Sequence, residues 1–272
     1  MSIRFGMIGG GVMGEAILSR LIAQEMYTPD SVLVSDPSPE RREELAQRYQ
    51  VTVTESNRQV MQETSEVLLL AVKPQVLPRI ESDWDGAQEK LEHRPLLISI
   101  LAGIPILRLK AGLDPLPVVR VMPNTNATVG ASMSAIAAGS GLRPEQMTLA
   151  KTILGAIGEV VEVPESAMDA VTGIAGSGPA YIALLIESLA DGGVAAGLPR
   201  STALQLATQT VLGTATLLQE EQLHPAQLKD RVTSPAGTTI AAVAELESAG
   251  FRSAVIKAVQ AATARSKELG KG

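Results

Sequence analysis

The stretch "GMIGGGVMG", residues 6–14, decides the fold of the first part of the chain. It contains G-x-G-x-x-G at Gly9, Gly11 and Gly14, directly after the apolar run 3–8. A glycine-rich turn that follows a strand and opens a helix is the setting of a dinucleotide-binding fingerprint. A plain glycine turn is the alternative, because glycine triplets also occur without a ligand.

Each glycine of the motif has a separate physical role in such a fingerprint. Gly9 would make the tight turn, Gly11 would leave room for a pyrophosphate, and Gly14 would let the helix pack on the strand. The N–H groups at the helix start, around Val12 and Met13, would bind the phosphates. The motif therefore predicts a dinucleotide-binding site at the N-terminus of the chain.

Short apolar runs alternate with helix-like segments from residue 1 to about 165. The runs are continuous, as expected for strands of a parallel sheet covered on both faces. Helix-like segments between them include 12–25 and 38–49, the latter with Ser38 before Pro39 at the first helical position. We predict an α/β Rossmann-like domain over 1–165, with a mostly parallel doubly wound sheet. Its expected strands are 3–8, 31–36, 66–72, 95–101 and 117–122, with edge strands at 131–139 and 158–163.

The second part of the chain, 166–272, has helical spacing throughout and is predicted to be all-helical. Prolines stand at expected helix starts and glycines at expected ends. Small residues dominate these helices, which gives a thin core for a domain of this size. We therefore expect the domain to bury apolar surface against a second copy of the chain; a self-contained bundle is the alternative. The expected helices are 178–198, 199–219, 235–250 and 251–269.

The composition of the 272 residues narrows the class of protein. The formal charge is -6, whereas a nucleic-acid-binding protein needs a dense basic face. There is no cysteine and there are two histidines, His93 and His224, so we expect no metal site. No run reaches 18 uninterrupted apolar residues, and the apolar run 3–8 follows the first residues directly, so we expect no secretory leader. We expect a cytoplasmic protein with no membrane and no nucleic-acid partner.

Polar residues at the ends of the predicted strands are candidates for cofactor contacts. Asp36 stands 22 residues after Gly14, where an acid usually holds the ribose 2′-hydroxyl of NAD and repels the 2′-phosphate of NADP. A phosphate bound by Ser38 and an arginine, Arg41 or Arg42, is also feasible. Asp36 as a turn residue is the third interpretation, so the sequence leaves NAD and NADP open.

Ligands of open α/β sheets lie beyond the carboxyl ends of the strands. "AVKP" stands at one such end and "MPNT", 122–125, at another, where Asn124 would face the nicotinamide side. Asn57 is a plausible helix cap that could also touch the adenine ribose. Simple turn residues are the alternative in each case. The cofactor contacts predicted from the first of these motifs are Ala71, Val72, Lys73 and Pro74.

The stretch "VTSPAGTT", 232–239, interrupts the helical half without any charge. We predict Ser234 as a helix cap and Pro235 as the first helical residue, with the following N–H groups free for an anion. A substrate carboxylate would fit such a site. An ordinary capped helix is the alternative, but it leaves Gly237 unexplained, because glycine weakens a helix interior.

A second glycine-rich segment, "GIAGSGPAY" at 173–181, is predicted to open a helix with Gly178 as its cap. The β-hydroxyacid dehydrogenases share this two-domain layout and carry a lysine four positions after the last glycine. Ile182 stands at that position here. Alcohol oxidation needs a base, whereas reduction of a protonated C=N bond does not. Imine reduction therefore suits this chain better.

The chain resembles the pyrroline-5-carboxylate reductase family from the glycine turn to the C-terminus. The ordered motifs that carry the resemblance are "AVKP", "MPNT", "GSGPAY", "ADGG" (190–193), "GLPR" (197–200), "HPAQLKD" (224–230) and "VTSPAGTTI" (232–240). The resemblance implies reduction of 1-pyrroline-5-carboxylate to L-proline, the last step of proline biosynthesis, with NADP(H) or NAD(H). It implies a homodimer with the active site at the interface. Larger rings of dimers are frequent in the family.

The resemblance also assigns the substrate residues. Ser234, Gly237 and Thr238 would bind the carboxylate, and the Thr239 hydroxyl would approach the ring nitrogen. Ser177 would also contact the substrate, and Lys73 is a second candidate catalytic residue.

Two positions depart from the family pattern: Asn126 stands where proline is usual, and Ala236 where glycine is usual. Alanine at the second position of a helix is sterically easy, so we expect the anion site to survive the change at Ala236. Two other functions stay open: a reductase of the same architecture for another imine or keto acid, and a non-catalytic NAD(P)-binding regulatory protein.

Overall fold

The structure is a computed structural model that describes residues 2–88 and 93–270. The chain separates into two compact units. Unit 1 consists of Met1–Gly176 and Ala261–Gly272, and unit 2 is Ser177–Gln260. The compact division thus lies 11 residues beyond the predicted boundary at 165/166, and the end of the chain returns to unit 1. The predicted boundary remains a prediction about domain organisation.

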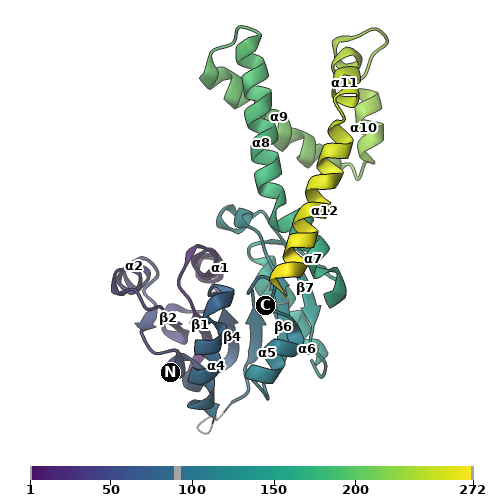
Figure 1. Cartoon of the computed structure of the whole chain (residues 1–272). Coiled ribbons are helices and arrows are strands. Elements are labelled where there is room, and N and C mark those ends of the chain that lie inside the picture. Colours follow the sequence, from purple (N-terminus) through teal and green to yellow (C-terminus); the bar gives the residue numbers. More distant parts are fainter. Residues whose placement is uncertain (1, 89–92, 271–272) are drawn as a thin grey trace. The chain divides into compact units, whose positions relative to one another are not determined.

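Unit 1 is built on one eight-stranded sheet with the order β3-β2-β1-β4-β5-β6-β7-β8. The first six strands pair in parallel, β7 pairs antiparallel with β6, and β8 pairs parallel with β7 (Figure 1). The predicted doubly wound sheet is confirmed. The strands expected at 131–139 and 158–163 are present as β7 and β8, but of these two only β8 is an edge strand, because β7 pairs on both sides. The strands are β1 Ile3–Ile8, β2 Val32–Ser35, β3 Thr52–Thr54, β4 Thr64–Leu70, β5 Leu96–Ser99, β6 Val118–Met122, β7 Ser132–Ala138 and β8 Gly158–Glu162.

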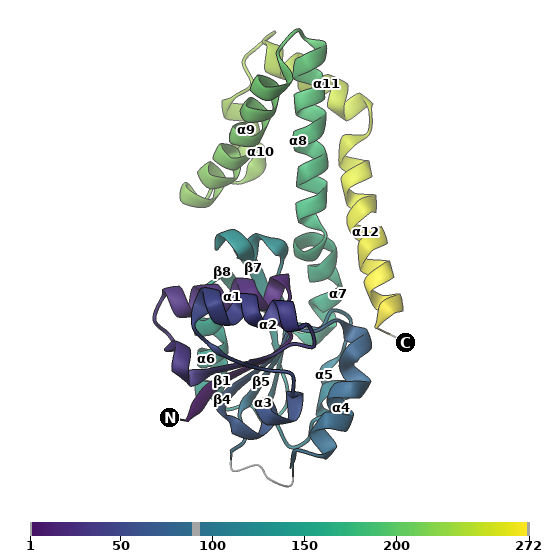
Figure 2. The ribbon, with the colours of Figure 1, turned by 90° about the vertical axis from the view of Figure 1, so that its left-hand side faces the viewer.

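Helices cover both faces of this sheet. One buried cluster joins the sheet to α1, α2 and α6, and a second joins the opposite face to α3, α4, α5 and α7. Figure 2 shows α1 and α2 on one side of the strands and α4 and α5 on the other. The helices of unit 1 are α1 Val12–Ala23, α2 Pro39–Tyr49, α3 Asn57–Glu63, α4 Leu77–Asp85, α5 Ile106–Gly112, α6 Pro144–Gly155 and α7 Met168–Val171.

Shorter helical turns connect these elements. They are the 3₁₀ turns η1 Pro29–Ser31, η2 Pro74–Val76, η4 Thr125–Val129 and η5 Glu165–Ala167, and the π-helical turn η6 Thr172–Gly176. Within η6, the Gly176 backbone lies so close to Met122 that a Cβ there would stand 2.7 Å from the methionine methyl carbon. The π turn therefore packs directly on the end of β6.

Strand β3 is the strand of unit 1 that the apolar pattern does not predict. It is three residues long, and its sequence Thr52-Val53-Thr54 has a single apolar residue. It pairs in parallel with β2 at the edge of the sheet. An edge strand this short buries little, so it leaves almost no hydrophobic signal in the sequence.

Unit 2 is entirely helical, as predicted. Its helices are α8 Gly178–Ala195, α9 Arg200–Glu220, α10 Pro225–Arg231, α11 Thr238–Ser248 and the greater part of α12 Phe251–Leu269. Gly197 and Gly250 follow α8 and α11 with left-handed φ values of 101° and 75°, which confirms their predicted role as helix ends. The short helix α10 was not predicted as a separate element.

The last turns of α12 belong to unit 1. The Ser266 hydroxyl donates to Asp169 Oδ1 at 2.7 Å, and Ser266 is 7% exposed. A Cβ on Gly270 would lie 2.9 Å from the Gly103 carbonyl oxygen, so the two backbones are in close contact. Unit 1 is therefore formed by two segments of the chain that are far apart in the sequence.

Candidate functional site

A pocket of about 300 Å³ opens at the carboxyl ends of β1, β2 and β4. Strands of an open α/β sheet present their ligands at this edge. The structure brings seven of the predicted cofactor residues together in its wall: Gly9, Gly11, Asp36, Asn57, Ala71, Val72 and Lys73. Residues separated by more than 60 positions in the sequence thus form one site.

The three motif glycines differ in what surrounds them. Gly9 has φ 101°, and a Cβ there would lie 2.6 Å from the Ala71 carbonyl oxygen. A Cβ on Gly14 would lie 2.4 Å from the Gly9 carbonyl oxygen. A Cβ on Gly11 would meet nothing within 4 Å. The fold therefore requires Gly9 and Gly14, whereas the space at Gly11 is free for a ligand.

The helix that follows offers hydrogen-bond donors. Gly11 is the N-cap of α1 and supplies no side chain to its first turn, which includes Val12 and Met13. In the described part of the chain, the first intrahelical bond of α1 is donated by Glu15 N–H to the Gly11 carbonyl at 2.9 Å. Val12, 68% exposed, begins the helix on the open side. Such a helix start is suited to an anionic group.

Asp36 braces the glycine loop. Its Oδ2 accepts the Gly10 N–H at 2.8 Å, and its Oδ1 accepts the Ser38 N–H at 2.9 Å. Each carboxylate oxygen has a further lone pair, so a ribose hydroxyl can still approach from the pocket. The carboxylate therefore sets the shape of the loop and presents its charge to the pocket. The bond to Gly10 joins residues 26 positions apart and was not foreseen.

Arg41 holds the same loop from the other side. Its Nε donates to the Gly10 carbonyl, and its other nitrogens contact Glu44 and Glu15. Arg42 donates to the carbonyl groups of Asp36 and Pro37 at 2.8 and 3.1 Å. Both arginines that could meet a phosphate are thus engaged within the fold.

Glu15 is the centre of a small ionic network. It accepts from Arg41, from Arg48 at 3.0 Å and from the Tyr49 hydroxyl at 2.7 Å. Although burial opposes ionisation, the hydrogen bonds from Arg41 and Tyr49 hold the pKa of Glu15 below its usual value. Burial, together with the hydrogen bond to Glu15, raises the pKa of Tyr49 to about 12. The network fixes α1 against α2 around the glycine loop.

Asn57 lines the pocket but does not cap its helix, so that prediction is wrong. Ser56 is the N-cap of α3, and its hydroxyl accepts the Gln59 N–H at 3.2 Å. The Asn57 amide instead accepts from the Ser35 hydroxyl at 2.8 Å and donates to Asp83 at 2.9 Å. It is therefore held rigidly at the pocket wall.

The pocket also contains residues that sequence reasoning missed, among them Ser35, Glu55, Val76 and Arg79. Glu55 and Arg79 bring one charge of each sign. Glu55 stands two residues before Asn57 and so was within reach of the same reasoning. Arg79 carries no local signal, because only the packing of α4 against the sheet brings it to the wall.

The remaining predicted cofactor residues, among them Ser38, Pro74 and Asn124, do not line this pocket. Ser38 caps α2, since its hydroxyl accepts the Arg41 N–H at 3.2 Å, and Pro39 is the first helical residue as predicted. Pro74 opens the turn η2 directly after Lys73. Asn124 follows β6 as the N-cap of η4 and is 8% exposed.

The stretch Ser234–Thr239 forms a turn before a helix, and not the predicted capped helix. The Gly237 N–H donates to the Ser234 carbonyl at 3.1 Å, and Ala236 has a left-handed φ of 55°. With Pro235 at the second position, this is the pattern of a type II turn. Gly237, φ −77°, is the N-cap of α11, which begins at Thr238. The predicted starts at Ser234 and Pro235 are therefore wrong.

The turn explains the environment of two residues of the stretch, Gly237 and Ala236. A Cβ on Gly237 would lie 2.3 Å from the Ser234 hydroxyl oxygen, so a side chain there would displace that hydroxyl from its present position. Ala236 occupies the position where a type II turn favours glycine, and a left-handed alanine costs about 1–2 kcal/mol. The expected place of Ala236 at the second position of a helix is therefore wrong, because Ala236 lies in the turn before the helix.

Two predicted donors change as a result. The Gly237 N–H closes the turn and is not free, and Ala236 precedes the helix instead of opening it. The first turn of α11 instead begins with Thr238 and Thr239, and the first intrahelical bond runs from Ala241 N–H to the Gly237 carbonyl at 3.4 Å. Thr238 is exposed and Thr239 half-buried. The start of the helix is therefore shifted by three residues, from Pro235 to Thr238.

The N-cap of helix α8 lies one residue before the predicted cap. Ser177 is the N-cap, Gly178 the first residue and Pro179 the second. The predicted cap at Gly178 is therefore wrong. Ser177 makes no side-chain capping bond, which leaves its hydroxyl available at the start of unit 2.

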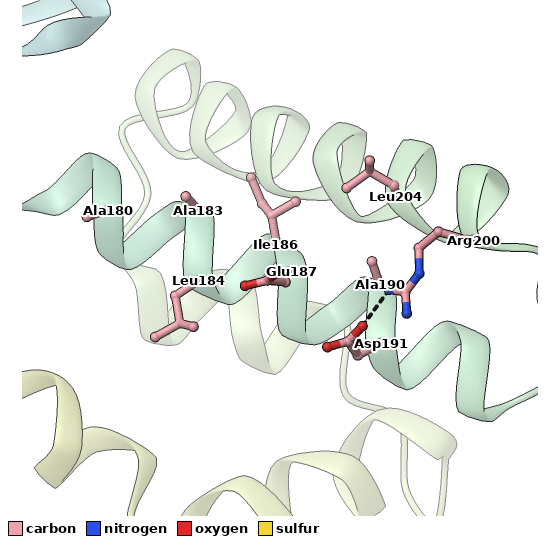
Figure 3. Close-up of a pocket in the computed structure, with 9 residues that line it drawn as sticks. All are labelled: Ala180, Ala183, Leu184, Ile186, Glu187, Ala190, Asp191, Arg200 and Leu204. Carbon is pink, nitrogen blue, oxygen red and sulfur yellow. Dashed lines mark hydrogen bonds and ion pairs between the residues drawn. The ribbon is translucent and has the colours of Figure 1, made fainter.

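An open groove of about 830 Å³ runs along α8 and α9 in unit 2. Figure 3 shows Leu184 and Glu187 on α8, and the ion pair that joins Asp191 to Arg200 of α9. Leu184 is 64% exposed and Leu204 of α9 47%. Exposed apolar residues of this size on facing helices indicate a surface that is covered in the assembled protein.

Known proteins match the chain over its whole length. Residues 165–269 match the family model described as pyrroline-5-carboxylate reductase dimerisation, and residues 4–103 match NADP oxidoreductase, coenzyme F420-dependent. The chain is 58% identical over 271 residues to the pyrroline-5-carboxylate reductase of Synechocystis sp., with both chains covered completely. This chain belongs to the pyrroline-5-carboxylate reductase family. The enzyme of the same name from Methanosarcina acetivorans is 45% identical, with 98% of each chain covered.

Solved structures of this family agree in fold. A pyrroline-5-carboxylate reductase from Coxiella burnetii matches 100% of both chains with a TM-score of 0.91 and 35% identity. A Plasmodium falciparum pyrroline carboxylate reductase, solved with NADP bound, covers 98% of both chains with a TM-score of 0.85 and 30% identity. The Rossmann-like domain with a second, helical domain is thus the fold of the family.

The dimerisation family model also accounts for an apolar helical segment. By length and composition Glu165–Ala195 could cross a membrane. Only 6% of its most apolar window is buried within this chain, so most of its apolar side chains are at least partly exposed. The same segment lies within residues 165–269, which match the dimerisation model. Exposed apolar side chains on this segment therefore fit a surface that pairs with a second copy.

Proposed function

We propose that this chain is an NAD(P)H-dependent pyrroline-5-carboxylate reductase, which reduces the C=N bond of 1-pyrroline-5-carboxylate to give L-proline. The observation that carries the proposal is full-length identity of 58% to a relative of that name. The pocket at the glycine loop supports the coenzyme half of the reaction, and the turn before α11 supports the substrate half. This reaction is the last step of proline biosynthesis.

The residues at the glycine loop fit a dinucleotide. The space beside Gly11 is empty of protein atoms, so a phosphate group can occupy it. The start of α1 offers N–H groups to the phosphate oxygens. A reduced nicotinamide coenzyme supplies the hydride in this chemistry. Gly9 and Gly14 shape the loop, Asp36 and Ser38 stand at the ribose end, and Asn57, Ala71, Val72, Lys73 and Pro74 follow the strand ends.

The substrate carboxylate is assigned to the start of α11. The N–H groups of Thr238 and Thr239 head that helix, where the helix dipole favours an anion. The Ser234 hydroxyl and Ser177 add neutral donors. Gly237 contributes shape, because its N–H closes the turn and the absence of a side chain leaves room for the Ser234 hydroxyl.

The proton for the product amine is assigned to the Thr239 hydroxyl, with Lys73 as the weaker candidate. Thr239 is the second residue of α11, so its hydroxyl lies beside the assigned carboxylate site. Lys73 is exposed at the pocket wall and is better placed to contact the coenzyme. Protonation of the imine before it binds would reduce the demand on either group.

The decisive experiment is oxidation of NADPH and of NADH with 1-pyrroline-5-carboxylate as substrate. Turnover with at least one coenzyme is expected, and no turnover with either would refute the proposal. Turnover only with another imine or a keto acid would indicate a different reductase, and coenzyme binding without any turnover would indicate a regulatory protein. Replacement Thr239→Val should lower kcat by ~10²-fold, whereas Thr239→Ser should retain most activity.

The choice between NADPH and NADH is assigned to Asp36. Asp36 and Glu55 line the pocket. Arg41 and Arg42 donate to backbone carbonyl groups of this region, and Arg42 also pairs with Glu55 at 3.9 Å. The Asp36 carboxylate, which forms no ion pair with either arginine, is therefore the negative charge that decides the choice of coenzyme. Negative charge at the ribose end favours a 2′-hydroxyl over a 2′-phosphate. We therefore expect Asp36→Ser to raise kcat/KM for NADPH relative to NADH. An unchanged ratio would show that Asp36 only stabilises the glycine loop and does not select the coenzyme.

The assembly proposed is a homodimer in the cytoplasm, with the active site at the interface of two chains and with rings of dimers as the larger form. The match of residues 165–269 to the dimerisation model supports the dimer. The exposed apolar side chains of unit 2 support it independently. A monomer with full activity in solution would contradict the shared site.

A further inference from the structure

One buried polar atom at the coenzyme edge of unit 1 has no partner. Asn124 is 8% exposed, and its Oδ1 accepts no hydrogen bond from any described residue. A buried acceptor without a donor costs free energy, so such atoms in folded proteins usually serve a ligand or an ordered water. Tyr27, Glu66 and Glu81 carry the other such atoms among the described residues, and none of them follows the carboxyl end of a strand.

The orientation of the Asn124 amide is set by its surroundings. Its Nδ2 donates to the Ala175 carbonyl at 3.1 Å. A carbonyl oxygen only accepts, so the nitrogen and not the oxygen must face Ala175. Ala175 lies in the π turn η6, and π turns of this kind occur frequently at functional sites. The unpaired Oδ1 is therefore held away from Ala175 in a fixed direction.

The place of Asn124 in the sheet indicates which part of a dinucleotide is near. A doubly wound sheet binds one mononucleotide half over β1 to β3 and the other over β4 to β6, at the carboxyl ends of the strands. The adenosine side is given by Asp36 after β2, and Asn124 follows β6 two residues after Met122. The turn η4 that it caps packs along α1, the helix of the glycine loop. Asn124 thus belongs to the nicotinamide half.

We propose that Asn124 Oδ1 accepts a hydrogen bond from the carboxamide N–H of the nicotinamide. A primary amide has two N–H donors, and one of them satisfies the lone acceptor while the ring lies toward β5 and β6. Asn124 is then a positioning residue that fixes the rotation of the carboxamide and, through it, the ring face that meets the substrate. The inference rests on the proposed function only in that the chain must bind a nicotinamide dinucleotide.

The test compares two ligands and two variants by calorimetric binding, without turnover. The ligands are the oxidised coenzyme that binds more tightly and its 3-acetylpyridine analogue, in which a methyl group replaces the amide NH₂. In the native chain the coenzyme should bind more tightly than the analogue. In Asn124→Leu this preference should fall about tenfold, equivalent to ~1.4 kcal/mol, because the acceptor is gone.

Asn126→Leu is the matched control, because Asn126 is exposed in the same turn; its preference should stay within about twofold of the native value. Asn124→Ala provides a second variant if the leucine disturbs folding, since the ratio of two affinities cancels a general loss of binding. An unchanged preference in both Asn124 variants would overturn the inference and assign Oδ1 to water. Absence of turnover with pyrroline-5-carboxylate would refute the proposed function. It would not change the ratio of the two coenzyme affinities, so the two proposals can fail separately.

Discussion

The two units differ in how much of their apolar surface is buried within one chain. Among the described residues, the largest fully buried side chains all belong to unit 1, such as Trp84, Phe5 and Met7, and lie in two clusters on the faces of the sheet. Unit 2 has a core of three alanines, Ala190, Ala203 and Ala207, while leucines of the same helices are exposed. Burial of one leucine contributes about 1.5–3 kcal/mol, so unit 2 lacks most of the stabilisation that unit 1 has. The difference indicates that unit 2 obtains its core from a second chain.

The strongest way to break this comparison is to place a charge on an exposed leucine in each unit. Leu184→Glu, in the groove of unit 2, should convert the dimer to monomer and lower activity at least ~tenfold, because a carboxylate would be buried without a partner. Leu107→Glu is the matched control, since Leu107 on α5 is 80% exposed in unit 1. Light scattering gives the mass of each variant. Two active dimers would contradict the assignment of the core to a partner.

Within unit 1, the glycine motif separates requirements of the fold from requirements of the ligand. Gly11→Ala should weaken coenzyme binding by about tenfold or more at unchanged melting temperature, because the added methyl enters only the ligand space. Gly14→Ala should lower stability by about 1–3 kcal/mol, because its methyl meets the Gly9 carbonyl. Titration calorimetry and thermal unfolding distinguish the two effects. Equal loss of stability in both variants would show that Gly11 is also structural.

Each unit also holds a strained residue that glycine should relieve. Ala236 in the turn of unit 2 has φ 55°, and Gln50 after α2 in unit 1 has φ 58°. Ala236→Gly should raise stability by ~1 kcal/mol, or about 2–4 °C in melting temperature, because glycine adopts this conformation without steric cost. The Gln50→Gly variant measures the same effect at a helix end. A destabilised Ala236→Gly would mean that the alanine side chain makes a contact in the dimer.

The smallest expected effect is a change in the pH dependence of stability. Glu15 has a folded-state pKa below its ordinary value of 4.5, so its contribution is complete above that pH and is lost as pH falls through the lower folded value. Glu15→Gln should therefore be less stable than the native chain near neutral pH. The two should converge as the pH is lowered below about 4.5. Denaturant unfolding between pH 3 and 7 measures this, and a constant difference would assign the effect to packing.

Most of unit 1 could be predicted from the sequence because its signals are local. A buried parallel strand reads as a continuous apolar run, and the glycine turn between β1 and α1 has a fixed spacing. The cofactor pocket follows, since the topology brings the ends of β1, β2 and β4 together. The bond from Gly10 to Asp36 and the wall position of Arg79 depend on packing between distant segments, and no local pattern carries them.

The turn before α11 shows why the rest could not be predicted. Ser-Pro is equally suited to a capped helix and to the first half of a type II turn, because proline has the same φ in both. The residue that decides is the next one, and glycine there would have indicated the turn. Ala236 hides that signal, so the helix was predicted to start at Pro235. The family pattern, with glycine at this position, contains the information that this single sequence lacks.

The return of α12 to unit 1 has a consequence for synthesis of the protein. Unit 2 is an insertion between Gly176 and Ala261, and unit 1 is a split domain. On the ribosome the N-terminal part of unit 1 emerges first, but the hydrogen bond from Ser266 to Asp169 requires the last turns of the chain. Unit 1 therefore reaches its final closure only after the whole of unit 2 has been translated. The segment made last completes the domain that was begun first.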